Sequence, residues 1–493
     1  MKPYCLVVWC AIAAAALCAG CSDPIEFPAS AMDEAASANH AFKAYDTDGD
    51  GQADFFMFAD DTGQVRRFGY DRSRDGAPDS FADLGANDVS QSRHLVIILD
   101  GATYGLVQEL RQAGHLRVFN PPSRVIATYP SMTDLCMGLA LGDMAPLAYE
   151  ARYFDHKHNR VVGGSGAYLA ETNEPHLRLI QYRAHTLWRG IGFLWPSSIL
   201  NKELATAMRS YNKAETREFI AYFAATAGMG TRKGASGHRD ALLRMERLIN
   251  QVLWESRGLT EVTLMSDHGH SYTPAKPLPV AEHLKQRGWR LTKDLRDNRD
   301  VVWIRFGLVT FASFATRDPP ALAKDLADCE GVEITSYADR DAVVVLDRDG
   351  GRAVVYKKNG RFRYEQTNGD PLKLEGILEQ LHPDEDGYYD ADALLTATSD
   401  HVYPAPLQRL WQGHFAMVQN PPDVICSLQD DYFAGSGGFG GLVPVTSTHG
   451  SLNCANSTAF IMSTIGPLPP VMRSGDIPHC MSDLIGRDWP IGR

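Results

Sequence analysis

The sequence has no apolar run long enough to cross a bilayer, no CxxC pair after residue 21 and no excess of positive charge. Its first apolar stretch, residues 6–17, is shorter than the roughly 20 residues that a membrane-spanning helix needs. Without CxxC pairs, a thiolate zinc site is not expected. A formal net charge of −12 gives no broad basic surface, so we expect no binding of a nucleic-acid duplex, and the acidic residues can instead hold cations.

The composition is that of an ordinary globular protein. Hydrophobic residues make up 44% and charged residues 22% of the chain, which does not indicate a long disordered region. A chain of 493 residues can bury one large core and support a small extra module. Five cysteines follow residue 21, and their spacing does not determine whether they form disulfides.

The first twenty residues are typical of a secretion signal. Lys2 supplies a positive start, residues 6–17 an apolar segment, and Ala19 and Gly20 a small-residue cleavage site. Residues 17–21 resemble a bacterial lipoprotein box, with Cys18 where that motif usually has Leu. We therefore predict a signal peptide at 1–20, lipidation of Cys21, and export to the periplasm, outer membrane or cell surface with a membrane anchor. Plain secretion with an unmodified Cys21 is the alternative.

An acidic repeat occupies the predicted module at residues 22–90. Residues 46–54 place oxygen-bearing side chains at alternate positions around Gly51, which permits a sharp turn and is typical of a calcium-binding loop. Residues 71–79 repeat the pattern, with Ser73 as a poorer ligand. Flanking aromatic residues indicate that both loops join strands, and the alternative is that they are simple turns. The predicted calcium ligands are Asp46, Asp48, Asp50, Gln52 and Asp54.

From residue 94 onward, apolar runs of strand length alternate with helical patterns. This alternation indicates an α/β domain with a mainly parallel sheet. Three of the predicted strands, at 94–99, 125–127 and 260–265, are followed by groups that can bind a metal. These groups are Asp100, Thr128, and Asp267 with His268. Because the active residues of open α/β sheets collect at the carboxyl ends of strands, we expect these side chains to lie together.

Taken in order along the chain, these segments resemble the alkaline phosphatase superfamily, especially its nucleotide pyrophosphatase/phosphodiesterase branch. The resemblance extends over about residues 94–470 and implies an alkaline-phosphatase-like three-layer α/β core. The matching segments are Asp100, Thr128-Tyr129-Pro130 with Gly138 ten residues after Thr128, Ser266-Asp267-His268-Gly269, and His449-Gly450.

The resemblance implies that Asp100, Asp267 and His268 hold a divalent cation, expected to be zinc. Thr128 would be the remaining ligand and the nucleophile, because coordination lowers the pKa of a hydroxyl group. Attack on a phosphate ester would form a phosphothreonine that water hydrolyses. Ser131 and Thr133 are rival hydroxyls. Thr128 is preferred for its distance to Gly138, and Ser131 then takes the position of a phosphate-contacting Asn in related enzymes.

The second metal site of the family is expected to be incomplete. It normally combines an Asp and a His four residues apart with the late histidine, here His449. The corresponding positions are predicted to be Ala225 and Met229, which are not zinc ligands. Arg232 and Lys233 would then bind the substrate by neutralising its charge.

A longer loop would offer a different replacement for the missing pair, namely His238 with Asp240. The sequence thus favours a metal-dependent phosphoric ester hydrolase, a phosphodiesterase or phosphatase. The alternatives are a single-metal phosphotransferase and a degenerate lipoprotein that binds a phosphorylated ligand.

The predicted domain spans residues 91–470. It carries insertions at about 145–220 and 300–372, the second of them β-rich, and is followed by a C-terminal tail at 471–493.

Overall fold

The structure is a computed structural model that describes residues 23–32, 42–89, 91–435 and 443–490. The predicted signal peptide and Cys21 lie outside the described residues. Within these ranges, no helix combines the length and apolar character that crossing a membrane requires. The five cysteines that the structure describes are all free thiols: Cys136, Cys329, Cys426, Cys454 and Cys480.

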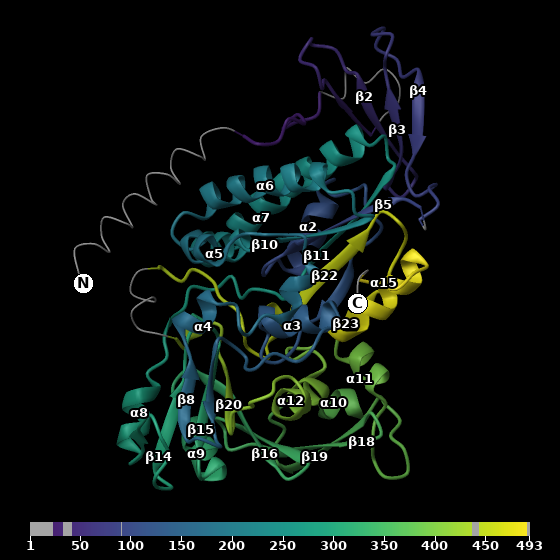
Figure 1. Ribbon diagram of the computed structural model, residues 1–493. Coiled ribbons are helices and arrows are strands. Elements are labelled where there is room, and N and C mark those ends of the chain that lie inside the picture. The colour runs from purple at the N-terminus through teal and green to yellow at the C-terminus, as the bar shows by residue number, and fades with distance from the viewer. Residues whose placement is uncertain (1–22, 33–41, 90, 436–442, 491–493) are drawn as a thin grey trace, which may run out of the picture.

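A seven-stranded sheet forms the centre of the molecule (Figure 1). Its strands, in spatial order, are β23 (Val471–Arg473), β6 (Ser123–Ile126), β22 (Thr458–Ser463), β11 (Thr260–Ser266), β5 (Arg93–Leu99), β10 (Glu218–Phe223) and β9 (Tyr182–Arg183). All of them run in the same direction except β22, which is antiparallel to both of its neighbours. The predicted mainly parallel sheet is confirmed.

Helices cover both faces of this sheet. One face packs on α2 (Tyr104–Gln112), α6 (Pro196–Lys213) and α7 (Ala225–Glu255), and the other on α3 (Thr133–Ala140) and α15 (Ile477–Ile485). Alternate residues of β5 divide between the two cores, with Leu95 and Ile97 on the first face and Val96 and Ile98 on the second. A strand that is buried on both sides is apolar throughout, and the three-layer α/β architecture is confirmed.

The acidic repeat belongs to a small antiparallel sheet at the top of Figure 1. Its strands are β1 (Lys43–Tyr45), β2 (Phe55–Ala59), β3 (Val65–Tyr70) and β4 (Ser80–Asp83). Residues 46–54 join β1 to β2 and residues 71–79 join β3 to β4, which confirms that both loops connect strands. Phe55 and Phe68 of this sheet lie in the same apolar core as Leu95, so the sheet packs on the main domain.

The predicted β-rich insertion is present, but its sheet extends beyond residues 300–372. The sheet has eight strands: β13 (Arg290–Leu291), β14 (Asp300–Ile304), β15 (Phe311–Thr316), β20 (Val424–Leu428), β16 (Val332–Asp339), β17 (Ala342–Asp347), β18 (Arg352–Lys358) and β19 (Arg361–Asn368). Its faces pack on α8 (Val280–Gln286) and α9 (Pro319–Ala327), and on α12 (Pro406–Phe415). Strand β20 pairs inside the sheet although 55 residues (369–423) separate it from β19.

Two further segments border the main sheet. Within the predicted insertion at 145–220 lie a hairpin of β7 (Arg152–Asp155) and β8 (Arg160–Gly163), and the short helices α4 (Ser165–Leu169) and α5 (Thr186–Gly192). The segment predicted as a C-terminal tail instead contributes β23, which pairs with β6, and α15, which packs against α3. Residues 471–485 therefore belong to the core.

Candidate metal centre

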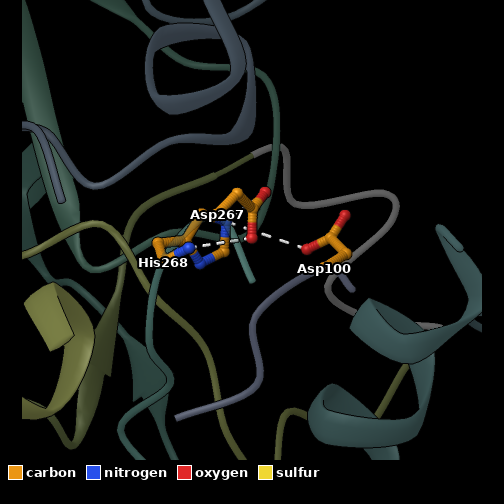
Figure 2. A group of neighbouring side chains, drawn as sticks. All are labelled: Asp100, Asp267 and His268. Atoms are coloured by element: carbon orange, nitrogen blue, oxygen red, sulfur yellow. Dashed lines mark hydrogen bonds and ion pairs between the residues drawn. The ribbon is translucent and has the colours of Figure 1, made fainter. Parts of the chain in front are cut away.

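The two aspartates are brought together by the register of two neighbouring strands. Strands β5 and β11 are parallel, and Leu99 lies opposite Ser266. The next residue of each strand therefore leaves the sheet at the same level, which places Asp100 beside Asp267. His268 follows directly, and Figure 2 shows the three side chains directed toward one another.

Each carboxylate has one oxygen that the protein satisfies. Tyr222 donates its hydroxyl hydrogen to Asp100 Oδ2 at 2.5 Å. The backbone N–H groups of Gly101 and His268 donate to Asp267 Oδ1 at 3.0 and 2.8 Å. These bonds orient both carboxylates and leave one oxygen of each free to bind another group.

The remaining oxygens converge on an imidazole nitrogen. Asp100 Oδ1 and Asp267 Oδ2 are buried without a hydrogen-bond partner, and they lie 3.7 and 3.5 Å from His268 Nε2. His268 Nδ1 lies 3.0 Å from the carbonyl oxygen of Gly269, so donation there leaves the lone pair on Nε2 available. Two carboxylate oxygens and one such nitrogen form a ligand set that suits zinc and other divalent cations.

The electrostatics of this group also favour a cation. Burial, together with the charge of Asp267, holds the pKa of Asp100 well above its usual range. Burial likewise raises the pKa of Asp267 and lowers that of His268. A buried pair of carboxylates repel each other unless a positive charge lies between them. The donor atoms, their free lone pairs and their charge all fit a divalent ion.

We call Asp100, Asp267 and His268 the metal group, because their side chains could hold an ion together. The hydroxyl group that contacts it is that of Thr133. It is the first residue of α3, and its Oγ1 lies 3.2 Å from His268 Nε2. Thr128 donates instead to the Pro130 carbonyl oxygen at 2.7 Å and lies 3.3 Å from Cys136 Sγ. The structure thus brings Thr133 to Asp100, Asp267 and His268, whereas the hydroxyl of Thr128 is bonded elsewhere.

Ser131 is fully buried in the turn before α3. Its hydroxyl donates to the carbonyl oxygen of Thr128 at 3.0 Å and accepts from Arg409 Nη2 at 3.1 Å. Arg409, which lies on α12, also donates to the Thr128 carbonyl oxygen at 2.9 Å. Ser131 therefore helps to hold the turn that precedes Thr133. The sequence contained no signal for Arg409, because a lone arginine on an amphipathic helix is usually solvated.

His449 lies at the edge of the metal group. Its ring stacks on that of His268 with 3.9 Å between centroids, and its Nδ1 lies 2.9 Å from the Ser131 carbonyl oxygen. It also lines a pocket of about 360 Å³ that opens beside Asp100 and Thr133. His449 is therefore brought to the group, although the three closest ligand atoms come from Asp100, Asp267 and His268.

The first turns of α7 present no second pair of metal ligands to this pocket. The lining residues there are Ala227 and Thr231, four positions apart, rather than the predicted Ala225 and Met229. Ala225 and Met229 lie in the apolar core on another side of the helix. The side chains at both pairs of positions lack the nitrogen, sulfur anion or carboxylate that zinc prefers.

His238 and Asp240 do not replace the missing ligands. Both ring nitrogens of His238 have partners, with Nε2 at 2.9 Å from the Thr226 carbonyl oxygen and Nδ1 at 2.8 Å from the Tyr272 hydroxyl. Asp240 accepts from Arg244 at 2.9 Å. Both side chains therefore already have hydrogen-bond partners within the protein.

The cationic side chain in the pocket wall is Arg189, for which the sequence contains no signal. It is 8% exposed and binds both oxygens of Glu174, at 3.0 and 2.8 Å. Arg232 and Lys233 lie elsewhere: Arg232 approaches the Phe193 carbonyl oxygen at 3.5 Å, and Lys233 donates to Ser197 at 2.7 Å. Neither of them is among the residues that line the pocket.

In the N-terminal sheet, three of the five predicted calcium ligands come together. The carboxylates of Asp46, Asp48 and Asp50 lie close enough to share an ion. Asp54 instead accepts from Thr47, at 2.8 Å from the backbone N–H and 2.5 Å from the hydroxyl. Arg74, from the second acidic loop, pairs with Asp48 at 2.7 Å, so part of the negative charge is already compensated. Calcium binding here stays a prediction.

Comparisons with known proteins give only distant likenesses. No family model matches the chain, and no curated protein matches it. Among solved structures, human ectonucleotide pyrophosphatase/phosphodiesterase 5 is similar at 11% identity, over 80% of this chain and 95% of that chain, with a TM-score of 0.44. The murine protein of the same name gives the same identity and coverages with a TM-score of 0.42. At this level the likeness assigns no function to the chain.

Proposed function

We propose that the protein is a metal-dependent phosphoric ester hydrolase whose nucleophile is Thr133. The observation that carries this proposal is the convergence of four atoms: Asp100 Oδ1, Asp267 Oδ2, His268 Nε2 and Thr133 Oγ1. Three are potential ligand atoms, two of which are carboxylate oxygens without a hydrogen-bond partner, and the fourth is the oxygen of a hydroxyl group. This differs from the threonine favoured by sequence spacing, since the hydroxyl of Thr128 is bonded to Pro130.

Asp100, Asp267 and His268 would hold the cation, with Thr133 as the fourth ligand. A bound divalent cation, zinc being the best match to two carboxylates and an imidazole, supplies a lower pKa for a coordinated hydroxyl and neutralises phosphoryl charge. Thr133 is also the first residue of α3, where the helix dipole favours the negative charge of a phosphate. The hydroxyl group of Thr133 therefore lies at the positive end of the α3 helix dipole.

The bonds change in two steps. Thr133 Oγ1 forms a bond to phosphorus while the bond from phosphorus to the departing alcohol oxygen breaks; the threonine proton passes to solvent, and the departing oxygen takes a proton from water. Water then attacks the phosphothreonine, which restores the hydroxyl and releases phosphate or a phosphate monoester. Arg409 supports both steps by holding the turn at Thr128 and Ser131.

A phosphotransferase or a non-hydrolysing binding protein is the second candidate, and one observation favours it. Ala227 and Thr231 line the pocket where a second pair of metal ligands would be needed to activate water. A phosphothreonine formed without that activation would accumulate or pass to another acceptor.

The test uses three variants and a nitrophenyl phosphodiester as substrate. Thr133→Ala is expected to lower kcat/KM of the zinc-loaded protein by about a thousandfold or more, because a nucleophile is lost. Thr133→Ser is expected to keep activity within about tenfold, and Thr128→Ala within about fivefold. Equal losses in Thr133→Ala and Thr128→Ala, or full activity in Thr133→Ala, would contradict the assignment. Mass spectrometry of acid-quenched enzyme separates a transient from an accumulating phosphothreonine.

A further inference from the structure

The pocket beside the metal group has a wall rich in carboxylates. It encloses about 360 Å³ and begins at Asp100, whose Oδ1 is buried without a partner. Away from Asp100, four more carboxylates line it: Asp134, Glu150, Glu171 and Glu174. Among the described residues of its lining, Arg189 is the only arginine, and no lysine is present. The wall therefore carries more negative than positive charge.

Two of these carboxylates are already neutralised. Glu174 forms a bidentate pair with Arg189, and Glu171 pairs with both Arg189 and Arg183. The guanidinium of Arg189 is thereby engaged by Glu174 and Glu171, and within the described residues it forms no direct ion pair with Asp134 or Glu150.

The other two have no cationic partner within the part of the chain that the structure describes. Asp134 accepts from the side-chain amide of Asn173 at 2.5 Å, and Glu150 accepts from the backbone N–H of Gly307 at 2.6 Å. Burial raises the pKa of Glu150 to about 7, as expected for a carboxyl group that lacks a positive neighbour. A cation that enters the pocket would therefore find two carboxyl groups without a cationic partner.

Aromatic rings complete the wall. Tyr149 and Tyr168 line the pocket together with Phe306, which lies 5.7 Å from Tyr168 between ring centroids. The guanidinium of Arg189 lies 5.6 Å from the centroid of the Tyr168 ring. Aromatic faces attract ammonium groups through their quadrupole, and the attraction grows when water is excluded. Carboxylates and aromatic faces together are the usual surroundings of a bound organic cation.

We infer that this pocket binds an ammonium group, so that the substrates are phosphate esters of amino alcohols such as choline or ethanolamine. The inference rests on the proposed hydrolase function. Thr133 and Asp134 both line this pocket, so a positive charge a few bonds from phosphorus can reach the Asp134 carboxylate. Substrates whose alcohol carries further phosphates would bring negative charge to Asp134 and Glu150 and are disfavoured.

The first experiment measures binding without turnover. Choline and its uncharged isostere 3,3-dimethylbutan-1-ol are titrated calorimetrically into the full-length, metal-free protein. Choline is expected to bind at least about tenfold more tightly, and Asp134→Asn and Glu150→Gln each to weaken it by about fivefold or more. Glu379→Gln, on an exposed part of the chain, is the matched control and should change nothing. Equal affinities for the two alcohols would overturn the inference.

The second experiment compares two nitrophenyl diesters with the zinc-loaded enzyme, one of choline and one of 3,3-dimethylbutanol. The choline ester is expected to have a kcat/KM at least about tenfold higher. An ethanolamine ester distinguishes hydrogen bonding to a primary ammonium from recognition of a quaternary one. Equal kcat/KM values would overturn the inference and leave the hydrolase standing. Failure to cleave either ester would remove the hydrolase and the substrate assignment, even where choline binds.

Discussion

At the scale of single residues, Asp100 and Asp267 oppose each other's ionisation. Their free oxygens both face His268 Nε2, and burial raises the pKa of each carboxyl group. Without a cation, the pair therefore lowers the free energy of unfolding, and a bound cation removes that repulsion.

Asp267→Asn is expected to raise the melting temperature of the metal-free protein, corresponding to about 1 kcal/mol. The amide oxygen of the new side chain can still accept from Gly101 and His268, and its NH₂ can donate to Asp100. The same variant should lose the stabilisation that zinc gives the wild type. Differential scanning calorimetry with and without zinc measures both effects. Asp61→Asn, at an exposed turn, is the control; a fall in metal-free stability for Asp267→Asn would contradict the argument.

Glu203 gives a pH-dependent prediction away from the ligands. Its side chain is 2% exposed and accepts from the Ala225 backbone N–H at 3.0 Å, and burial raises its pKa to about 8. In the unfolded chain the pKa is about 4.3. Between about pH 4.3 and pH 8 the folded protein thus holds a proton that the unfolded chain releases, so this group makes stability fall as pH rises.

Glu203→Gln is expected to remove that dependence. The wild type should lose up to about 1.4 kcal/mol per pH unit relative to the variant within this range, with little further change above pH 8. Urea unfolding of both proteins at pH 5, 6, 7 and 8 gives the difference. Parallel stability curves would show that Glu203 is ionised in the folded protein.

The three candidate metal ligands could be predicted from the sequence, but the threonine that contacts them could not. Asp100, Asp267 and His268 follow strands that apolar runs define clearly, so their convergence follows from the sheet. Thr128 lies between β6 and α3, whereas Thr133 is the first residue of α3, and the choice between them depends on where the helix begins. Helix starts are poorly determined by sequence, and the distance to Gly138 carries no information about them. Glu174 and Arg189 meet only through tertiary packing.

At the scale of elements, the loop between β1 and β2 is the clearest case of a local pattern that forms as expected. Its three aspartates come together because Gly49 and Gly51, both at positive φ, let the backbone turn tightly. The boundaries of the eight-stranded sheet were less predictable. β20 joins it from a distant part of the chain, and a short apolar strand has no local signal for its partner.

Calcium is expected to raise the melting temperature of the whole protein through this loop. Tyr45 and Phe55 flank the loop and belong to the main core, so ion binding there should stabilise the entire fold. At a concentration ten times the dissociation constant the gain is about 1.4 kcal/mol. Asp48→Asn should remove most of it, whereas Asp75→Asn in the second loop should not. The absence of any difference between wild type and Asp48→Asn would exclude the site.

At the scale of the whole molecule, the described chain begins at residue 23, two residues after the predicted lipidation site Cys21. The segment from residue 23 to residue 32 packs beside α7, with Phe27 6.4 Å from Trp254 between ring centroids. A lipid on Cys21 would therefore hold the protein by the side that carries the small sheet.

Cys21→Ser tests the predicted lipidation. Wild-type protein expressed in a bacterium is expected to incorporate labelled palmitate and to sediment with membranes, whereas the variant should do neither and should leave the cell envelope in soluble form. Immunoblots of the fractions give the readout. Wild-type protein that stays unlabelled and soluble would instead support plain secretion.

The pairing of Leu99 with Ser266 has one more consequence. The two aspartates owe their spacing to backbone hydrogen bonds between central strands, and no flexible loop intervenes between the sheet and either carboxylate. One additional residue inserted into either strand would move its aspartate out of step with the other while the helices around the sheet kept their places. The alignment of the candidate metal ligands is thus a property of the strand pairing itself, and grafting the three side chains onto another scaffold would require copying that pairing along with them.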